Sequence, residues 1–197
     1  MEITNIAQLD LSKRYTYADY LQWKFEERVE LFKGFIARMS APNRKHQEVS
    51  VTLTLALGGF FAGYPCKMYT APFDVRLPKA NSKGDKKVNT VVQPDICVVC
   101  DRSKLDERGC IGAPDLVVEI LSPSNSKKEM DSKYDLYEEA GVKEYWIVDP
   151  RAETVLIYVL DPEKEKFYGI KPLVVDNILH SPTFPGLEIP VEKIFAE

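Results

Sequence analysis

Histidine and cysteine are scarce in this chain of 197 residues, which contains two histidines and four cysteines. The sequence has no G-x-x-x-x-G-K-[ST] loop, no G-x-G-x-x-G fingerprint and no G-x-S-x-G elbow. These absences remove the usual sequence support for a P-loop, a dinucleotide site and an α/β-hydrolase nucleophile. His46 and His180 lie far apart in the sequence, so a serine-hydrolase triad is unsupported as well.

The cysteines lack the spacing of a zinc site. Val98 and Val99 separate Cys97 from Cys100 and continue a strand, and residues three apart on a strand face opposite sides. The chain has no second C-x-x-C pair and no paired histidine. We therefore expect the cysteines at positions 66, 97, 100 and 110 to be small buried side chains, not a zinc or redox site.

Excess positive charge is also missing, since 26 Lys and Arg residues stand against 30 Asp and Glu residues, for a net charge of −4. This balance argues against coating nucleic acid or an anionic membrane by charge alone. An enzyme on DNA is still possible, because bound metal ions supply positive charge.

The first 15 residues contain no apolar run typical of a secretory signal, and the uncharged stretch 49–66 includes three glycines. We expect a cytoplasmic protein without a membrane span.

With 45% apolar and 28% charged residues and no low-complexity tract, the chain has the composition of one globular α/β domain over residues 1–197. Thr16 is the expected cap of a helix that extends to about residue 25, and a hairpin is expected to turn at Lys33 and Gly34. Further helices are predicted at about 45–61 and from a capping box at Ser126 and Glu129 to Gly141. Strands are predicted at 66–70, 73–77, 91–99, 116–121 and 144–148, with weaker ones at 155–160, 167–170 and 187–189.

Two carboxylates are embedded in apolar strands, Asp95 in the segment 91–99 and Glu119 in the segment 116–121. A charge inside such a strand is costly unless it is paired, bound to metal or at a sheet edge. On adjacent strands the two could converge on one Mg²⁺ or Mn²⁺, although a solvated sheet face explains the pattern equally well. Asp115 shares a face with Glu119 but lies ~13 Å away along the strand, so we assign it to the turn.

A basic loop lies between the predicted strands 73–77 and 91–99. It carries Lys79, Lys83, Lys86 and Lys87 against the single acid Asp85. A solvated hairpin tip is the ordinary interpretation, and a contact to nucleic-acid phosphate is the functional one.

Several motifs occur together and in order: Gln93-Pro-Asp-Ile, then Pro114-Asp-Leu-Val-Val-Glu-Ile-Leu-Ser-Pro-Ser124, then Lys133 to Tyr137, then Gly141-Val-Lys-Glu-Tyr-Trp-Ile-Val-Asp-Pro150. With Arg28-Val-Glu-Leu and Arg44-Lys-His-Gln they cover most of the chain. In this set the chain resembles a bacterial family usually called "putative restriction endonucleases", assigned to the PD-(D/E)xK nuclease superfamily. The resemblance implies a restriction-endonuclease-like mixed sheet flanked by helices, with a core at about 44–150, an N-terminal helix and hairpin, and extra C-terminal strands.

The resemblance also implies site residues. Asp95 and Glu119 would hold Mg²⁺ or Mn²⁺, and Glu30 is a secondary candidate for a further acid. The superfamily places a lysine two residues after the strand acid, where this chain has Leu121. In the family a lysine on the following helix stands in for it, and the matching residue here is Lys133.

Helical spacing makes this substitution possible, because Glu129, Lys133 and Tyr137 occur at i, i+4 and i+8 and share one face. Met130 and Tyr134 can then face the core. An exposed ion pair between Glu129 and Lys133 is the ordinary alternative. We regard His46 as a side chain that satisfies a local hydrogen bond.

The hypothesis that follows is a metal-dependent endonuclease acting on DNA, with Asp95, Glu119 and Lys133 as catalytic residues. The alternative is a nuclease-like fold that has lost activity and serves as a binding module. Cleavage of both strands of a duplex would suit a homodimer, because two equivalent sites match the two-fold relation of the duplex.

Overall fold

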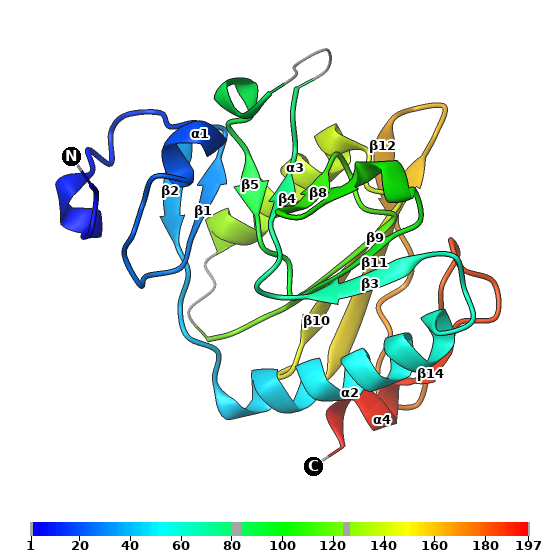
Figure 1. Cartoon of the computed structure of the whole chain (residues 1–197). Coiled ribbons are helices and arrows are strands. Elements are labelled where there is room, and N and C mark those ends of the chain that lie inside the picture. The colour runs from blue at the N-terminus through cyan, green and yellow to red at the C-terminus, as the bar shows by residue number, and fades with distance from the viewer. Residues whose placement is uncertain (1, 80–83, 124–126, 197) are drawn as a thin grey trace.

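The computed structural model describes residues 2–79, 84–123 and 127–196 and contains a central mixed sheet (Figure 1). Its strands, in spatial order, are β12 (Lys166–Gly169), β11 (Thr154–Asp161), β10 (Glu144–Asp149), β9 (Leu116–Ile120), β6 (Ile96–Val99) and β3 (Lys67–Thr70). β9 and β10 run parallel, and the other neighbours pair antiparallel. The predicted α/β class with a mixed sheet is therefore confirmed.

Helices cover both faces of the central sheet. α2 (Arg44–Phe61) and α4 (Val191–Phe195) pack on one face, and α3 (Lys127–Ala140) packs on the other. The alternation along β9 decides which side chain meets which helix. Leu116 and Val118 belong to the apolar cluster of α2, whereas Val117 belongs to that of α3. Glu119 shares the face of Val117 and so points toward α3.

A second sheet joins the N-terminal hairpin to the middle of the chain. Its strands, in spatial order, are β2 (Phe35–Arg38), β1 (Val29–Phe32), β5 (Val91–Val92), β4 (Val75–Arg76), β8 (Gly109–Ile111) and β7 (Leu105–Asp106). The hairpin turns at Lys33 and Gly34, as predicted, with φ of 51° and 93°. The helix expected to reach residue 25 is only α1 (Tyr17–Tyr20), although Thr16 caps it as predicted.

The predicted single strand 91–99 is in fact two strands in different sheets. β5 pairs with β1 and β4, whereas β6 pairs with β3 and β9. Pro94 lies at the break, where its missing N–H cannot contribute to a ladder. The chain therefore crosses from one sheet to the other at Gln93-Pro94-Asp95, and Asp95 immediately precedes β6.

The helix boundaries follow local signals. Asn43 caps α2 by accepting a hydrogen bond from the backbone N–H of His46 at 2.9 Å. α3 ends before Gly141, whose φ of 83° fits the glycine expected there. Ser126, the expected cap of α3, lies outside the described residues. Near the end of the chain, β13 (Ile178–His180) and β14 (Glu188–Pro190) form a small sheet, and α4 follows it. β14 corresponds to the strand predicted at 187–189, whereas β13 and α4 were not predicted.

The cysteine prediction is correct for two residues and wrong for the other two. Cys97 and Cys110 are buried free thiols, and burial raises the pKa of Cys110 to about 11. Cys66 and Cys100 instead form a disulfide. They flank the pair Lys67–Val99 of β3 and β6, so the strand register places them opposite each other.

In the described part of the chain, no helix combines the length and apolar character needed to cross a membrane.

Candidate active site

A cavity of about 70 Å³ lies where the two sheets and the helices meet. Its lining includes Glu30 of β1, Asp95 just before β6, Glu119 of β9, His46 of α2 and Lys133 of α3. The structure thus brings together the three predicted catalytic residues and the secondary candidate Glu30. Each comes from a different element, so the cavity depends on the whole fold.

Strand register places the two central carboxylates side by side. Ile96 pairs with Val118 in the antiparallel β6–β9 ladder, and one further step along this register sets Asp95 opposite Glu119. Directly paired residues lie about 5 Å apart and share a face. Asp95 Oδ2 also accepts the backbone N–H of Ile120 at 2.8 Å, which holds the aspartate against β9.

Lys133 points into this group of acids and not into solvent. Its Nζ lies 2.8 Å from Glu119 Oε1 and 3.3 Å from Glu30 Oε1. One turn further along α3, the Tyr137 hydroxyl donates to the same Glu119 oxygen at 2.6 Å. Glu129 lines the cavity as well. The predicted shared helix face is therefore confirmed.

The charges in this cluster perturb one another. Burial raises the pKa of Glu119, and the carboxylates of Asp95 and Glu30 raise it further against the opposing effect of Lys133. Burial lowers the pKa of Lys133, but Glu119 and Glu30 outweigh burial and leave the pKa above its usual value. Lys133 is therefore a permanent cation. A nearby positive charge such as Lys133 stabilises the ionised form of Glu119, which burial disfavours.

The three acids differ in how accessible they are. The side chains of Asp95 and Glu119 are 20% and 11% exposed, whereas that of Glu30 is 3% exposed. Glu30 Oε1 also accepts the backbone N–H of Gln93 at 2.8 Å. A cation entering the cavity would therefore meet Asp95 and Glu119 first, while Glu30 stays packed against Lys133.

This donor set fits a hard divalent cation that keeps part of its water shell. Within the described residues, no three or more His, Cys, Asp or Glu side chains are arranged to enclose a metal ion. Mg²⁺ rarely needs such a cage, since one or two carboxylates with several waters suffice. Among the described residues, Lys133 and Tyr137 both donate to Oε1 of Glu119. The pair Asp95–Glu119 supplies the oxygen ligands that Mg²⁺ or Mn²⁺ prefers.

His46 belongs to the site, although its sequence pattern indicated only a local hydrogen bond. Its Nε2 lies 3.3 Å from Asp95 Oδ1, and its Nδ1 is buried without a partner among the described residues. Helix capping by Asn43 places it on the first turn of α2, facing the cavity. The spacing within Arg44-Lys-His-Gln gave no indication that it would contact Asp95, because that contact joins distant segments.

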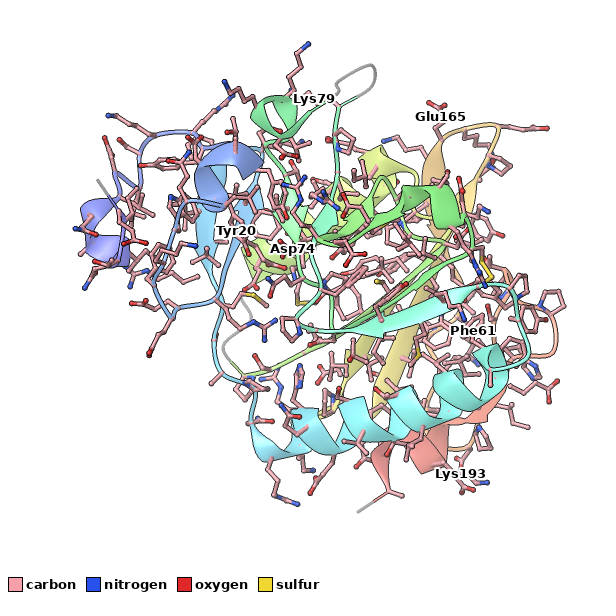
Figure 2. The ribbon with its side chains drawn as sticks, viewed as in Figure 1. Tyr20, Phe61, Asp74, Lys79, Glu165 and Lys193 are labelled. Atoms are coloured by element: carbon pink, nitrogen blue, oxygen red, sulfur yellow. A yellow bond between two sulfur atoms is a disulfide. The ribbon has the colours of Figure 1, made fainter. Side chains whose placement is uncertain are left out.

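Gln93 connects the site to the second sheet. Its side-chain oxygen accepts hydrogen bonds from Arg28 Nε at 3.1 Å and Nη2 at 2.7 Å. Its nitrogen donates to Asp74 at 2.9 Å and to the Tyr20 hydroxyl at 3.2 Å. Figure 2 shows Tyr20 and Asp74 close together between α1 and β4. Burial and the charge of Asp74 raise the pKa of Tyr20, so this hydroxyl remains protonated.

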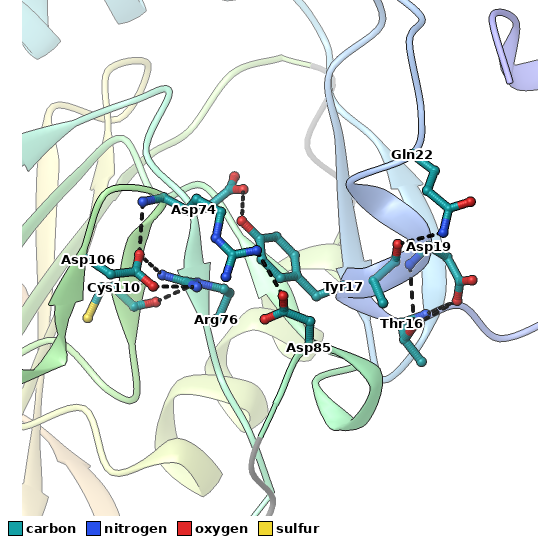
Figure 3. A network of polar contacts seen from close by, with 11 residues as sticks. Thr16, Tyr17, Asp19, Gln22, Asp74, Arg76, Asp85, Asp106 and Cys110 are labelled. Atoms are coloured by element: carbon teal, nitrogen blue, oxygen red, sulfur yellow. Dashed lines mark hydrogen bonds and ion pairs between the residues drawn. The ribbon is translucent and has the colours of Figure 1, made fainter. Parts of the chain in front are cut away.

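A polar network supports Asp74 from behind (Figure 3). The Tyr17 hydroxyl donates to Asp74 at 3.2 Å, and Arg76 stacks on the Tyr17 ring at 5.1 Å. The fully buried Arg76 guanidinium donates to Asp106 at 3.0 Å. These contacts join β4, β7 and α1 into a frame that fixes Gln93.

The basic loop lies elsewhere. Lys79, Lys86 and Lys87 are exposed, and Lys83 lies outside the described residues. Lys79 lines a different cavity, of about 280 Å³, with Lys33 and Thr90. None of the three described lysines lines the carboxylate cavity.

Comparisons with known proteins identify the family and the fold. The Uma2 family, described as "Putative restriction endonuclease", matches residues 17–192. An uncharacterized protein of Synechocystis sp. is 27% identical over 143 residues, which are 71% of each chain. A solved structure from Anabaena variabilis, described as a putative nuclease, has a TM-score of 0.70 at 21% identity and covers 92% of this chain and 98% of its own. The structural likeness establishes a shared fold.

Proposed function

The chain belongs to the family described as "Putative restriction endonuclease", and from this membership we propose that it is a metal-dependent nuclease that hydrolyses phosphodiester bonds in DNA. The observation that carries the proposal is the burial of Lys133 against Glu119, in the cavity that Asp95 also lines. Paired carboxylates can hold a metal ion that activates water, and a lysine in the same cavity can stabilise the charge that develops on a phosphate diester.

Asp95 and Glu119 would hold Mg²⁺ or Mn²⁺. When bound, such an ion neutralises phosphate charge and lowers the pKa of a coordinated water. His46 supports this role by contacting Asp95 Oδ1, and the backbone N–H of Ile120 holds Oδ2. Both contacts fix the direction in which the Asp95 carboxylate presents its remaining lone pairs.

Lys133 would stabilise the negative charge that grows on the phosphate oxygens in the transition state. Glu30 and Glu119 keep its ammonium protonated, and the surrounding burial limits its motion. Tyr137, one turn further along α3, donates to the same Glu119 oxygen, Oε1. The four side chains form a preorganised unit, so little reorganisation would accompany the reaction.

The departure from the superfamily pattern is consistent with this assignment. Leu121, where a lysine is usual, packs with the apolar side chains beneath α3. Lys133 approaches Glu119 from that same face of the sheet. The positive charge is therefore available at Glu119 from a helix and not from the strand.

Cleavage of plasmid and single-stranded DNA by purified protein tests the proposal. Reactions would contain Mg²⁺ or Mn²⁺, with chelator as a control, and would compare the wild type with Glu119→Gln and Lys133→Met. Lys166→Met is the matched control for the lysine, because Lys166 is 69% exposed in an ion pair with Glu138. We expect cleavage that needs metal, survives Lys166→Met and is lost in the other two variants.

Other outcomes would change the assignment. Cleavage that survives Lys133→Met would remove the lysine from the mechanism but leave the enzyme. No cleavage of any substrate, together with no calorimetric sign of Mn²⁺ binding, would instead indicate a nuclease-like fold that serves as a binding module.

A further inference from the structure

A second hollow adjoins the carboxylate cavity. It has a volume of about 310 Å³ and shares Arg28, Pro42, His46 and Asp95 with the first cavity. From this common boundary it extends along α2 toward Thr70 and Ala71 at the end of β3. A chain that passes through the carboxylate site would therefore continue directly into this groove.

Arg28 lies at the boundary of the two cavities with its guanidinium held in place. Gln93 Oε1 accepts from its Nε and Nη2, and Gln93 is itself buried and held by Asp74 and Tyr20. A guanidinium has five N–H donors, so two bonds to Gln93 leave others for a ligand. Arg28 is exposed, and it is the one permanent cation among the described residues of this groove.

One face of α2 forms the wall of the groove. Gln47, Ser50 and Thr54 supply neutral polar groups, and Val51 and Leu55 lie between them. The spacing i, i+3, i+4, i+7, i+8 places all five on one side of the helix. Val51 is 57% exposed and Leu55 is 72% exposed, whereas Val49, Leu53, Leu57 and Phe61 of α2 are buried in the core.

We propose that this groove binds an unpaired nucleic-acid strand next to the scissile phosphate, with Arg28 holding one phosphate and Val51 and Leu55 contacting bases. A duplex surface would need several Lys or Arg side chains for its phosphates, and the described lining of the groove has one. An unpaired strand can turn apolar base faces toward the helix. The inference rests on the proposed function, because it takes a nucleic acid as the substrate.

Binding measured without metal separates this inference from catalysis. Fluorescence anisotropy in chelator would follow a labelled oligothymidylate, and the same oligomer annealed to oligodeoxyadenylate, across a salt series. Each neutralised phosphate of a single strand contributes a slope of about −0.7 in log affinity against log salt. We expect the single strand to bind more tightly than the duplex, with a shallow slope.

Arg28→Met tests the phosphate contact, with Arg102→Met as its charge-matched control. Arg102 is exposed and follows β6 at the end opposite Asp95. We expect Arg28→Met to weaken single-strand binding about tenfold and to reduce the slope by about 0.7, while Arg102→Met changes neither. Equal binding and equal slopes in the two variants would overturn the role of Arg28.

Leu55→Glu tests the apolar wall, and Val174→Glu, at a 45% exposed valine outside the groove, is its control. We expect only Leu55→Glu to weaken binding of the single strand. Tighter binding of the duplex than of the single strand by the wild type would overturn the preference for an unpaired strand. Cleavage by the wild type with no effect of either groove variant on binding would reject the groove and keep the nuclease. Binding that depends on Arg28 without any cleavage would keep the groove and reject the nuclease.

Discussion

Two buried glutamates occupy neighbouring parallel strands and have opposite surroundings. Glu119 lies near the end of β9, beside the cavity, and its oxygen meets the ammonium of Lys133. Glu144 begins β10 at the other end of the sheet, level with Leu116. It is fully buried and accepts from Trp146 Nε1 at 2.6 Å, the Ser181 hydroxyl at 2.8 Å and the backbone N–H of Thr183 at 2.8 Å.

The contrast separates the acid that we propose as a metal ligand from an acid that holds the fold together. Glu144 has three neutral donors and lines none of the cavities described above, so it serves to attach the segment 181–183 to the sheet. Asp115 belongs to the same end, where it accepts from Cys100 N at 2.7 Å and contacts Lys143 at 2.7 Å, and it occupies the turn before β9 as predicted. Glu119 instead contacts the ammonium of Lys133, lies near the acids Asp95 and Glu30, and lines a cavity.

The largest expected effect separates the two glutamates by activity. Glu119→Gln removes a proposed metal ligand, and several kcal/mol of transition-state stabilisation correspond to a loss of roughly 10³-fold in metal-dependent cleavage. Glu144→Gln leaves the cavity intact, and we expect activity within about threefold of wild type at a temperature where both variants are folded. Comparable losses in the two variants would contradict the distinction. Cleavage rates at saturating Mn²⁺ are the measurement.

A smaller but still large effect is expected for the lysine. Lys133→Met removes a buried charge-stabilising group and should lower the turnover rate by roughly 10²-fold or more. Lys143→Met is the matched control at the structural end, since Lys143 is 63% exposed in its pair with Asp115. Single-turnover kinetics would separate a loss in the rate of the chemical step from a loss in substrate binding. An equal loss in Lys143→Met would indicate a general electrostatic effect and not a role for Lys133.

His46 is expected to act through Asp95, as a positioning residue. His46→Ala should weaken Mn²⁺ binding about tenfold, because outer partners of metal ligands have effects of that size. His46→Gln keeps a side-chain N–H and should restore much of the affinity. Calorimetric titration with Mn²⁺ gives the comparison, and thermal unfolding shows whether both variants are folded. Equal affinities for the two variants would remove this role.

Stability should rank the two glutamates in the reverse order. Glu144→Gln places an NH₂ group against donors and should lower the free energy of unfolding by about 1–3 kcal/mol. Glu119→Gln should cost less, because the amide oxygen can still accept from Tyr137, Lys133 keeps Glu30, and repulsion from Asp95 is relieved. Urea denaturation measures both. A larger loss in Glu119→Gln would show that its ion pair is mainly structural.

The sequence was informative where local chemistry decides the outcome. The hairpin at Lys33 and Gly34, the Thr16 cap of α1 and the shared face of Lys133 and Tyr137 all follow from turn preference, capping or helical spacing. The adjacency of Asp95 and Glu119 was also within reach, because each lay in a recognisable apolar strand. These predictions needed only neighbours along the chain and the pairing of two strands.

Contacts between distant segments were out of reach. The break at Pro94 sends β5 and β6 into different sheets, although the apolar run reads as one strand. The Cys66–Cys100 disulfide depends on the β3–β6 register. The contact between His46 and Asp95 joins α2 to β6. Each requires knowing which elements meet, and composition or periodicity does not contain that information.

Calorimetric titration of Mn²⁺ into the wild type, Glu119→Gln and Glu144→Gln would decide whether the cavity end of the sheet is the metal-binding end. The pair of variants controls for the loss of one buried carboxylate from the same sheet. We expect the wild type and Glu144→Gln to bind Mn²⁺ alike and Glu119→Gln to show no binding. Equal binding by all three proteins would contradict the assignment of Glu119 as a metal ligand.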